Sequence, residues 1–488
     1  MNYELLLPEL IVAASALIVL LAVFIKDGGK KFAGYLSIIA LLTALILVLK
    51  DGLVTPAAYF NDTIVIDPLS QIFNMIFLVV ALLVVIAGIR YNEDKPNAEV
   101  FYSLLLFATL GMMIVAISND LIPLFVGFEL ASLATYPLAA FEREKRGIEA
   151  SVKYFVIGGL SSAILLFGLS YIYGVTGTTK IPEVADALAV NLMTPASLLG
   201  LLFVIAGFGF KMALVPFHMW AVDVYDGAPY IVTALLSSAS KKMAFIAGFK
   251  VLIVGLIALR VDWYIGIALL AVMTMTLGNV VAAVQKSVKR MLAYSSVAHA
   301  GYIAIAFVVI SKSLSAAEIA VAGGILHIFS HALMNLGAFL IVAVVATAAL
   351  SKVKPGEEDN LDNYAGLGRI APVTALLMAI LMLSLGGVPP TFGFFSKAVI
   401  FLSAIKADLL WIAIIGVLNS ALSLFYYARV VMYMYYRDPV LDRVSEPLMY
   451  ILPIALATVG VLLLGLYPPT YEWAFEAART LLAMGGIL

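Results

Sequence analysis

Charged residues that stand inside long apolar segments are the features of this sequence that could do chemistry. Lys211 lies about fifteen residues into SLLGLLFVIAGFGFKMALVPFHMW, and Lys241 holds a similar place in APYIVTALLSSASKKMAF. Glu129 occupies the middle of NDLIPLFVGFELASLATYPLAAF. A charge at mid-bilayer costs about 3 kcal/mol on insertion scales, so such a residue normally faces a partner or a water-filled cavity. If these segments cross a membrane, their charges are functional candidates.

A buried acid beside a buried base is the smallest set of side chains that can take up a proton and release it. Glu129 is the natural counter-charge for a buried lysine, and a change in the distance between carboxylate and ammonium changes how tightly the proton is held. Lys242 points about 100° away from Lys241 on a helix, so we do not expect the two to share one role. A static ion pair that fixes helix packing is the alternative. One acid cannot neutralise all the buried bases, which include Lys211, Lys241, His299, His327, His331 and Lys397.

Histidines add groups that titrate near neutral pH. His327 and His331 in GGILHIFSHALMNLGAF are four residues apart and therefore share one helix face. A metal site is the rival interpretation, although no carboxylate or cysteine stands near them on that helix. His218 follows Pro216 and could instead bond freed backbone. Lys153 is a further candidate for proton translocation, but it lies near a helix end and could equally reach the interface, as could Lys250 and Arg429.

Composition places all of these residues in a membrane. The chain has 488 residues, of which 64% are hydrophobic and 12% charged, whereas soluble domains carry about 25% charged residues. Apolar runs recur from end to end, so we expect one membrane domain in contact with the lipid bilayer. The first run lacks the basic leader and cleavage site of a signal peptide, and we expect it to be retained.

The same composition excludes several classes of function. The absence of cysteine removes thiolate-ligated iron–sulfur clusters and disulfides. A net charge of −1 gives no electrostatic basis for binding nucleic acid, and no glycine-rich phosphate loop is present. We therefore expect no cofactor, no metal and no catalytic residue in this chain, so that any redox chemistry belongs to another subunit.

Hydropathy predicts an all-α integral membrane protein of about fourteen transmembrane helices. The expected spans are 5–25, 32–50, 67–89, 100–118, 120–141, 151–175, 197–220, 228–257, 262–284, 291–311, 317–350, 371–402, 409–436 and 447–467. The last segment, 471–488, is short and is expected to lie along the surface.

The basic residues of the predicted loops give the orientation. Sixteen fall on one side of the membrane and six on the other, and cytoplasmic loops are the ones that collect Lys and Arg. The alternation requires an even number of helices with both termini on the outer side. We expect a multi-pass protein of the plasma (cell inner) membrane.

Two predicted helices carry breaks in matching places. GFGFKMALVPFH puts Pro216 after Lys211 in the seventh helix, and SLGGVPPTFGFFSK puts Pro389 and Pro390 before Lys397 in the twelfth. Proline removes a backbone hydrogen bond, so both helices should unwind locally. Each is the fourth of a five-helix group, which predicts two inverted repeats. The domains expected are a three-helix segment (1–99), a first repeat (100–257), a second repeat (258–436) and a C-terminal helix and tail (437–488).

The residues quoted above, together with GNVVAAVQKSVKRMLAYSSVAHAGY and DNYAGLGRIAP, closely resemble the antiporter-like proton-pumping subunits of respiratory complex I and its relatives, with subunit N as the best match. The resemblance extends from about residue 60 to about residue 440. It implies fourteen helices, inverted five-helix repeats and broken seventh and twelfth helices. It also implies an oxidoreductase complex whose iron–sulfur clusters, flavin and quinone or phenazine chemistry lie on partner subunits, with K-, M-, L- and J-type membrane subunits as neighbours.

By the same resemblance, Glu129 and Lys211 form a modulating ion pair, Lys241 passes protons on centrally, and Lys397 faces the exit or the neighbouring subunit. One position departs from the L-type relatives, because Asn335 stands where they carry a lysine four residues after the His-x-x-x-His pair. A cation/proton antiporter subunit of the Mrp type and a membrane-bound hydrogenase subunit are the alternatives. The sequence leaves open whether NADH, ferredoxin or a reduced deazaflavin feeds the complex.

Overall fold

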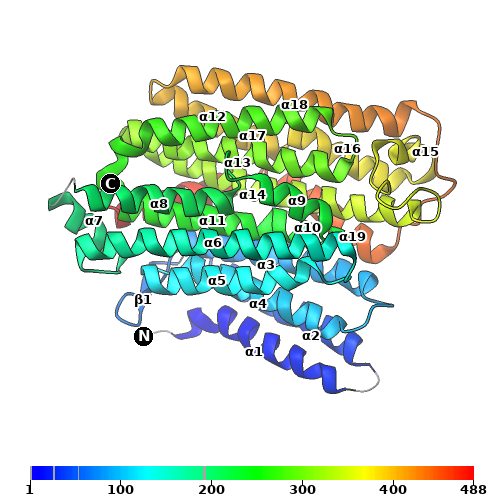
Figure 1. Ribbon diagram of the computed structural model, residues 1–488, viewed down its shortest axis with the longest axis horizontal. Coiled ribbons are helices and arrows are strands. Elements are labelled where there is room, and N and C mark those ends of the chain that lie inside the picture. The colour runs from blue at the N-terminus through cyan, green and yellow to red at the C-terminus, as the bar shows by residue number, and fades with distance from the viewer. Residues whose placement is uncertain (1–2, 26–27, 53, 191–193, 488) are drawn as a thin grey trace.

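The protein is a bundle of helices that run side by side along the long axis of the molecule (Figure 1). The computed structural model describes residues 3–25, 28–52, 54–190 and 194–487. Both chain ends lie at the same end of the bundle, on the left in Figure 1, beside the short hairpin of β1 (Ala57–Tyr59) and β2 (Ile64–Ile66). We call this end the terminal end. Lys26, one of the basic loop residues, lies outside the described residues.

The first part of the chain forms helices that follow the predicted spans closely. They are η1 (Tyr3–Leu6), α1 (Leu7–Leu21), η2 (Ala22–Phe24), α2 (Gly29–Asp51), α3 (Pro68–Tyr91), α4 (Ala98–Ile117), α5 (Leu121–Ala139) and α6 (Lys145–Thr176). Their starts have local causes. Asp67 caps α3 by accepting from the backbone N–H of Ser70, with Pro68 in the first turn, where its missing N–H costs nothing.

The middle of the chain is more interrupted than its hydropathy predicts. The elements are α7 (Ile181–Val190), α8 (Pro195–Met212), α9 (Met219–Gly227), α10 (Tyr230–Leu235), η3 (Leu236–Ser240), α11 (Lys241–Gly248), η4 (Phe249–Gly255) and η5 (Ile257–Leu259). The stretches η3 and η4 are π-helical. Residues 231–255 are buried all round, so this helix has no face toward the surface of the subunit.

The remaining helices complete the bundle. They are α12 (Arg260–Val284), α13 (Val288–Lys312), η6 (Leu314–Ala316), α14 (Ala317–Ala349), η7 (Leu361–Tyr364), α15 (Leu367–Ile370), α16 (Pro372–Gly386), α17 (Phe392–Lys406), α18 (Leu410–Tyr436), α19 (Leu448–Leu463) and α20 (Pro468–Met484). The long helix α14 packs against α13, α17, α19 and α20, and so forms the centre of the bundle.

Eleven of the described helices are long and apolar enough to cross a membrane, and the bent pair α19 and α20 raises the number to twelve. The predicted count of fourteen adds the segment 230–255, which π-helical stretches interrupt, and the segment 372–406, which divides into α16 and α17. The pair α19 and α20 is bent by 82°, so the last helix turns away from the preceding span. The all-helical membrane fold is confirmed.

Both predicted breaks are present, and they share the same local geometry. The helix α8 ends where Ala213 adopts a left-handed conformation with φ of 58°, and α16 ends where Gly387 does so with φ of 83°. A left-handed residue after the last turn is a common helix stop. A cis peptide bond precedes Pro216 in the first break and Pro390 in the second.

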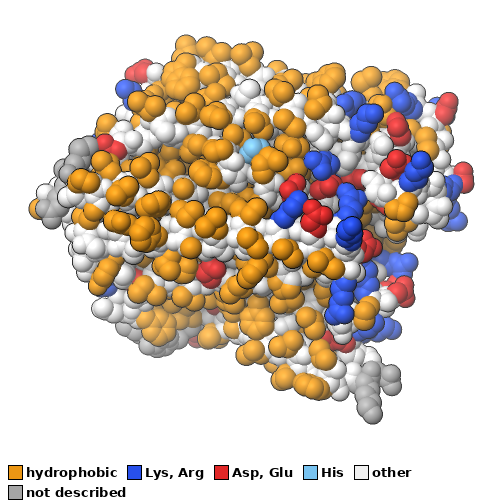
Figure 2. Space-filling model, viewed as in Figure 1, with side chains coloured by type: hydrophobic (Ala, Val, Ile, Leu, Met, Phe, Trp, Pro, Cys, Tyr) orange, Lys and Arg blue, Asp and Glu red, His pale blue; other side chains and the backbone are white. Residues whose placement is uncertain are grey.

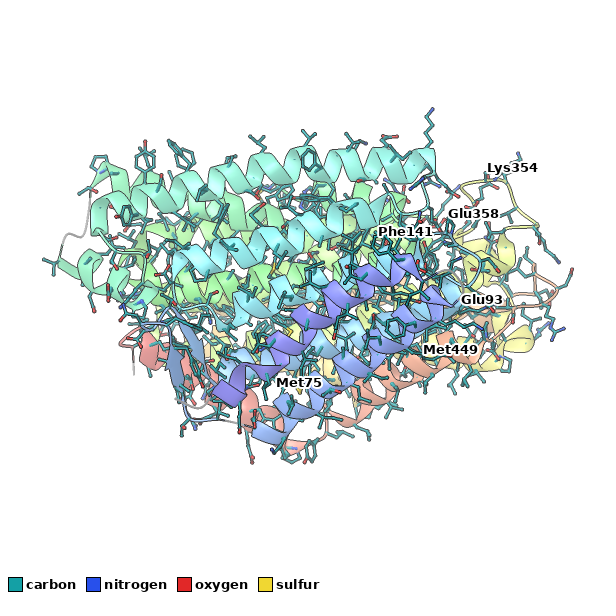
Figure 3. The ribbon with its side chains drawn as sticks, turned by 90° about the horizontal axis from the view of Figure 1, so that it is seen from below. Met75, Glu93, Phe141, Lys354, Glu358 and Met449 are labelled. Carbon is teal, nitrogen blue, oxygen red and sulfur yellow. The ribbon has the colours of Figure 1, made fainter. Side chains whose placement is uncertain are left out.

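Charged side chains gather at the end of the bundle opposite the termini, on the right in Figure 2, while apolar side chains cover the flanks. We call this end the basic end. Glu93, Lys354 and Glu358 mark it in Figure 3, whereas Met75 on α3 lies nearer the middle of the molecule. The arrangement agrees with a bilayer that crosses the helices between the two ends.

A buried chain of titratable side chains as the candidate functional site

Lys211 lies in the last turn of α8, immediately before the first break, and is 2% exposed. Its Nζ donates to the Ser132 Oγ of α5 at 2.7 Å and to the Tyr154 OH of α6 at 3.1 Å. The ring centroids of Tyr154 and Phe128 lie 5.2 and 5.5 Å from the same Nζ, within the range of cation–π attraction. The lysine is therefore buried among hydroxyls and aromatic faces.

Glu129 lies in the middle of α5 and accepts a hydrogen bond from the Ser162 Oγ of α6. It is only partly buried. Within the described residues no ion pair joins Glu129 to Lys211, because Lys211 bonds to Ser132, one turn further along α5. The predicted pair is thus separated in this structure, although both residues reach the space between α5 and α6.

The two adjacent lysines of α11 reach different partners. Lys241 Nζ donates to the backbone oxygen and to the Oγ of Ser296 on α13, each at 2.9 Å. Lys242 Nζ is hydrogen-bonded to His331 Nδ1 on α14. Both lysines are 1% exposed, and both can be interior because the helix around them is buried on every side. The two lysines therefore have different hydrogen-bond partners on α13 and α14.

Three histidines and a tyrosine link α13, α14 and α18. His299 Nδ1 and His327 Nε2 are 2.9 Å apart, and His299 Nε2 lies 3.3 Å from the Tyr427 OH. Tyr427 is in turn hydrogen-bonded to Ser295, which neighbours Ser296 on α13. The ring of His331 lies 4.4 Å from that of His299. A hydrogen-bonded path thus runs from beside Lys241 to His327.

The path continues to α17, beside the second break. His327 Nδ1 shares a hydrogen bond of 2.9 Å with the Oγ of Ser396. The next residue, Lys397, is 3% exposed and donates to the backbone oxygen of Leu385 at 2.9 Å and to Ser420 Oγ at 3.0 Å. Leu385 lies in the last turn of α16, so Lys397 satisfies a carbonyl at the C-terminal end of the broken helix.

Aromatic side chains lie between the surroundings of Lys211 and those of Lys241. Tyr154, which bonds Lys211, stacks on Trp220 with ring centroids 4.8 Å apart. Trp220 contacts Tyr225, whose ring centroid is 5.8 Å from Lys241 Nζ. The hydroxyl of Tyr225 is buried without a hydrogen-bond partner. Aromatic rings therefore separate Lys211 from Lys241, and no described hydrogen bond joins the two lysines.

Asn335 and His331 leave further polar atoms without partners. Both amide atoms of Asn335 and the Nε2 of His331 are fully buried and unbonded. The two residues are four apart on α14, so their side chains lie on one face.

The other buried or half-buried bases have structural partners. Lys153 pairs with Glu149 at 2.9 Å and with Asp223 at 3.3 Å, and its side chain is 43% exposed, so it lies apart from the buried path. Lys250 donates to the backbone oxygens of Ala116 and Ser118 at the end of α4.

Arg429 and the loop at the basic end also form hydrogen bonds that stabilise the ends of helices. Arg429 donates to the backbone oxygens of Ala283 and Gln285 and so completes the end of α12. In the loop 351–366, burial raises the pKa of Asp359, while a hydrogen bond from Ser287 acts in the opposite direction. This bond fastens the loop to the start of α13.

Several members of the path were not identified from the sequence. They are hydroxyl-bearing residues and one lysine: Ser132, Tyr154, Lys242, Ser295, Ser296, Ser396 and Tyr427. Serine and tyrosine are ordinary in membrane helices, so only the fold distinguishes these positions. The described residues contain no group of three or more His, Asp or Glu that could hold a metal ion.

Fold and site together define a class: a multi-spanning membrane protein with two broken helices and a buried line of lysines and histidines between them. The comparisons agree. Residues 118–423 match the family model described as NADH:quinone oxidoreductase/Mrp antiporter, transmembrane. The chain belongs to this family.

Relatives are similar over nearly the whole length. The chain is 50% identical to F(420)H(2) dehydrogenase subunit N of Methanosarcina mazei, over 97% of this chain and 98% of the relative. It is 38% identical to NADH-quinone oxidoreductase subunit N of Trichlorobacter lovleyi, over 96% of this chain and 95% of the relative.

Solved structures show the same fold. Respiratory complex I from Thermus thermophilus contains a chain that is 29% identical, with a TM-score of 0.80, over 95% of this chain and 97% of that one. The Mrp complex from Dietzia contains a chain of TM-score 0.86 at 21% identity, with complete coverage of both chains. The second likeness concerns the fold alone.

Proposed function

We propose that this chain is the proton-translocating membrane subunit of a redox-driven pump of the complex I type. The observation that carries the proposal is the buried path from Ser295 through Tyr427 and His299 to His327, with Lys241 bonded to the adjacent Ser296. Lys211 and Lys397 lie beside the two helix breaks. Hydrogen-bonded hydroxyl and imidazole groups can both accept and donate a proton, and can therefore pass protons along such a path. The relatives named subunit N support the assignment.

Coupling would act on Lys211. In the structure its ammonium bonds Ser132 and Tyr154 rather than Glu129. A shift that brings Glu129 toward Lys211 would hold the proton there, and a separation would release it toward Lys241. Moving one charge against 100 mV requires about 2.3 kcal/mol, which is within the range of one change in a buried ion pair. Lys153, which is half exposed, would act as a surface charge near the basic end.

The subunit would carry no catalytic group of its own. Oxidation of the donor and reduction of a quinone or phenazine would occur on partner subunits, with their iron–sulfur clusters and flavin. The neighbours would be membrane subunits of the K, M, L and J types. The chain would lie in the plasma membrane with both termini outside, and residues 100–257 and 258–436 would form the inverted repeats between the segments 1–99 and 437–488.

Proton pumping by the intact complex in sealed vesicles tests the proposal. Lys211→Ala and Glu129→Gln are compared with the wild type while electron transfer is recorded in parallel. We expect both variants to assemble and to lose most of the pumping and of the coupled electron transfer. Lys250→Ala is not a suitable control because it uncaps α4, whereas Lys406→Ala, at the end of α17, changes a lysine outside the path. Unchanged pumping in both site variants would show that these charges only fix packing.

Purification separates this function from that of a cation/proton antiporter subunit. The native complex is isolated from its membrane and its subunits are identified by mass spectrometry. Iron–sulfur subunits that co-purify support a redox-driven pump. Small antiporter chains without any iron–sulfur subunit would overturn the proposal in favour of an Mrp-type assembly.

A further inference from the structure

A second group of buried polar side chains lies between α1 and α3, apart from the path described above. Glu9, in the first turn of α1, is 7% exposed, and its Oε1 accepts a hydrogen bond of 2.8 Å from Asn74 Nδ2. Gln71 and Asp67 precede Asn74 on α3 by three and seven residues, so the three side chains form one stripe. All four residues are more than nine-tenths buried.

This group contains four buried oxygens that accept no hydrogen bond. One oxygen of each side chain is buried without a hydrogen-bond partner: Glu9 Oε2, Asp67 Oδ2, Gln71 Oε1 and Asn74 Oδ1. An unpaired buried polar atom costs about 1–3 kcal/mol. Four such oxygens along one stripe therefore call for a proton, a cation or water to supply the missing partners.

A cavity lies beside Gln71, one residue of the stripe, near the terminal end of the bundle. It has a volume of about 70 Å³ and is lined by Gln71, Gly52, Met75 and Trp473, among others. Gly52 follows the last residue of α2, whose end lies at the terminal end. Because a water molecule needs about 30 Å³ in the liquid, the cavity has room for water beside Gln71. In Figure 3, Met75 lies well apart from Glu93 and Glu358 of the basic end.

We propose that Glu9 is a proton-binding site that exchanges protons with the aqueous phase at the terminal end through the cavity beside Gln71. A protonated Glu9 has an O–H that can donate to an amide oxygen, which gives the group the donor it lacks. Water in the cavity supplies a partner for Gln71 Oε1 and carries the proton between Gln71 and the surface.

A single metal cation fits the geometry less well. Asp67 and Asn74 are seven residues apart, which corresponds to about 10 Å along a helix. Oxygen ligands lie within about 2.6 Å of ions such as Ca²⁺, so the four oxygens cannot surround one ion. A proton on Glu9 needs only one neighbouring acceptor.

Neighbouring charges do not determine the state of Glu9. The helix α1 packs against η1, α2 and α4. The charged residues on these elements are Glu4 on η1, Lys30, Lys31, Lys50 and Asp51 on α2, and Glu99 on α4; Asp67 and Arg90 lie on α3. Glu99 lies beside Gly29, at the far end of α2 from Glu9. No ion pair among the described residues includes Glu9, so burial and the Asn74 amide control its proton.

A hydrophobic carbodiimide tests this site in the intact complex. Dicyclohexylcarbodiimide reacts with a protonated carboxyl group: the acid proton moves to a carbodiimide nitrogen, the carboxylate oxygen bonds to the central carbon, and the adduct rearranges to a stable N-acylurea. The complex is reconstituted in liposomes, labelled at about pH 6 and about pH 8.5, and the peptide that contains Glu9 is measured by mass spectrometry. We expect several-fold more adduct at the lower pH.

Variants separate the site from simple reagent access. Asn74→Leu removes the donor that stabilises the carboxylate, so we expect the adduct at pH of about 8.5 to increase. Gln71→Leu replaces the polar wall of the cavity, and exchange with the terminal side should slow. Glu9→Gln must abolish the adduct on this peptide.

Two results would overturn the proposal. A Glu9 peptide that remains unmodified at both pH values has no protonated carboxyl that the reagent can reach. Adduct formation that Na⁺ suppresses at constant pH would identify a cation site instead. The inference does not depend on the proposed function, because the labelling is measured without electron transfer.

Discussion

At the scale of single residues, Tyr427 is a position that the buried path of hydrogen bonds cannot bypass. Its hydroxyl joins Ser295 on α13 to His299, and no other described hydrogen bond makes this connection. We predict that Tyr427→Phe lowers the rate of proton pumping by about tenfold, since the loss of one hydrogen bond worth about 1.4 kcal/mol corresponds to that factor. Pumping in sealed vesicles, measured with assembly of the complex, checks the prediction.

A tyrosine away from the path provides the control. Tyr471 on α20 is partly buried, and its hydroxyl donates to the backbone oxygen of Gly465 at 2.7 Å. Tyr471→Phe therefore removes the same atom, together with one hydrogen bond, and should leave pumping within about twofold of the wild type. Equal losses in the two variants would mean that the loss of a tyrosine hydroxyl impairs the subunit in general and that Tyr427 does not carry protons.

The residues of the site differ in how well the sequence revealed them. A lysine or histidine in an apolar segment is conspicuous because its burial is costly, and Lys211, Lys241, His299, His327 and Lys397 are all buried. Tyr427 is one of 23 tyrosines, and nothing in its local sequence distinguishes it from Tyr426. Its role follows only from the contact between α13 and α18, which sequence spacing does not give.

At the scale of elements, the two helix breaks place Lys211 and Lys397. The second break depends on Gly387, whose φ of 83° is unfavourable for any residue with a Cβ. A Cβ at this position would lie 3.3 Å from Lys397 Cδ and 3.5 Å from Lys397 Nζ. We predict that Gly387→Val destabilises the subunit by about 1–3 kcal/mol and also reduces pumping, measured as thermal inactivation and pumping of the assembled complex.

Gly266 is the control for the loss of a glycine. It lies within α12, and a Cβ there meets nothing within 4 Å. Gly266→Val should leave thermal inactivation and pumping unchanged. If Gly387→Val behaves in the same way, the left-handed turn does not hold Lys397 in place.

Sequence patterns predicted the helices best where hydropathy and proline positions alone determine where a helix lies. Proline positions identified both breaks, because proline disrupts a helix by a local steric effect. The π-helical stretches η3 and η4 inside 230–255 were not predicted, since they have no local sequence signal and arise where buried side chains must reach partners. The hairpin of β1 and β2, which precedes α3, was also missed.

At the scale of the whole molecule, the two ends of the bundle differ in charge, and this difference predicts the orientation of the subunit in the membrane. The basic end carries the ion pairs of Arg90, Arg146, Lys352 and Arg369 with nearby carboxylates. Both chain termini lie at the opposite end (Figure 1). The positive-inside rule predicts that the basic end faces the cytoplasm, in which case protons would leave at the terminal end.

Labelling of single cysteines tests this orientation, and the chain suits it because it contains no cysteine. Asp62 is exposed in the loop at the terminal end, and Lys354 is exposed in the loop at the basic end. In intact cells we predict that a membrane-impermeant maleimide modifies Asp62→Cys and spares Lys354→Cys. After the membrane is opened with detergent, both should react. Modification of Lys354→Cys in intact cells, with Asp62→Cys protected, would invert the orientation; Glu9 would then exchange protons with the cytoplasm, and the direction of pumping would have to be assigned anew.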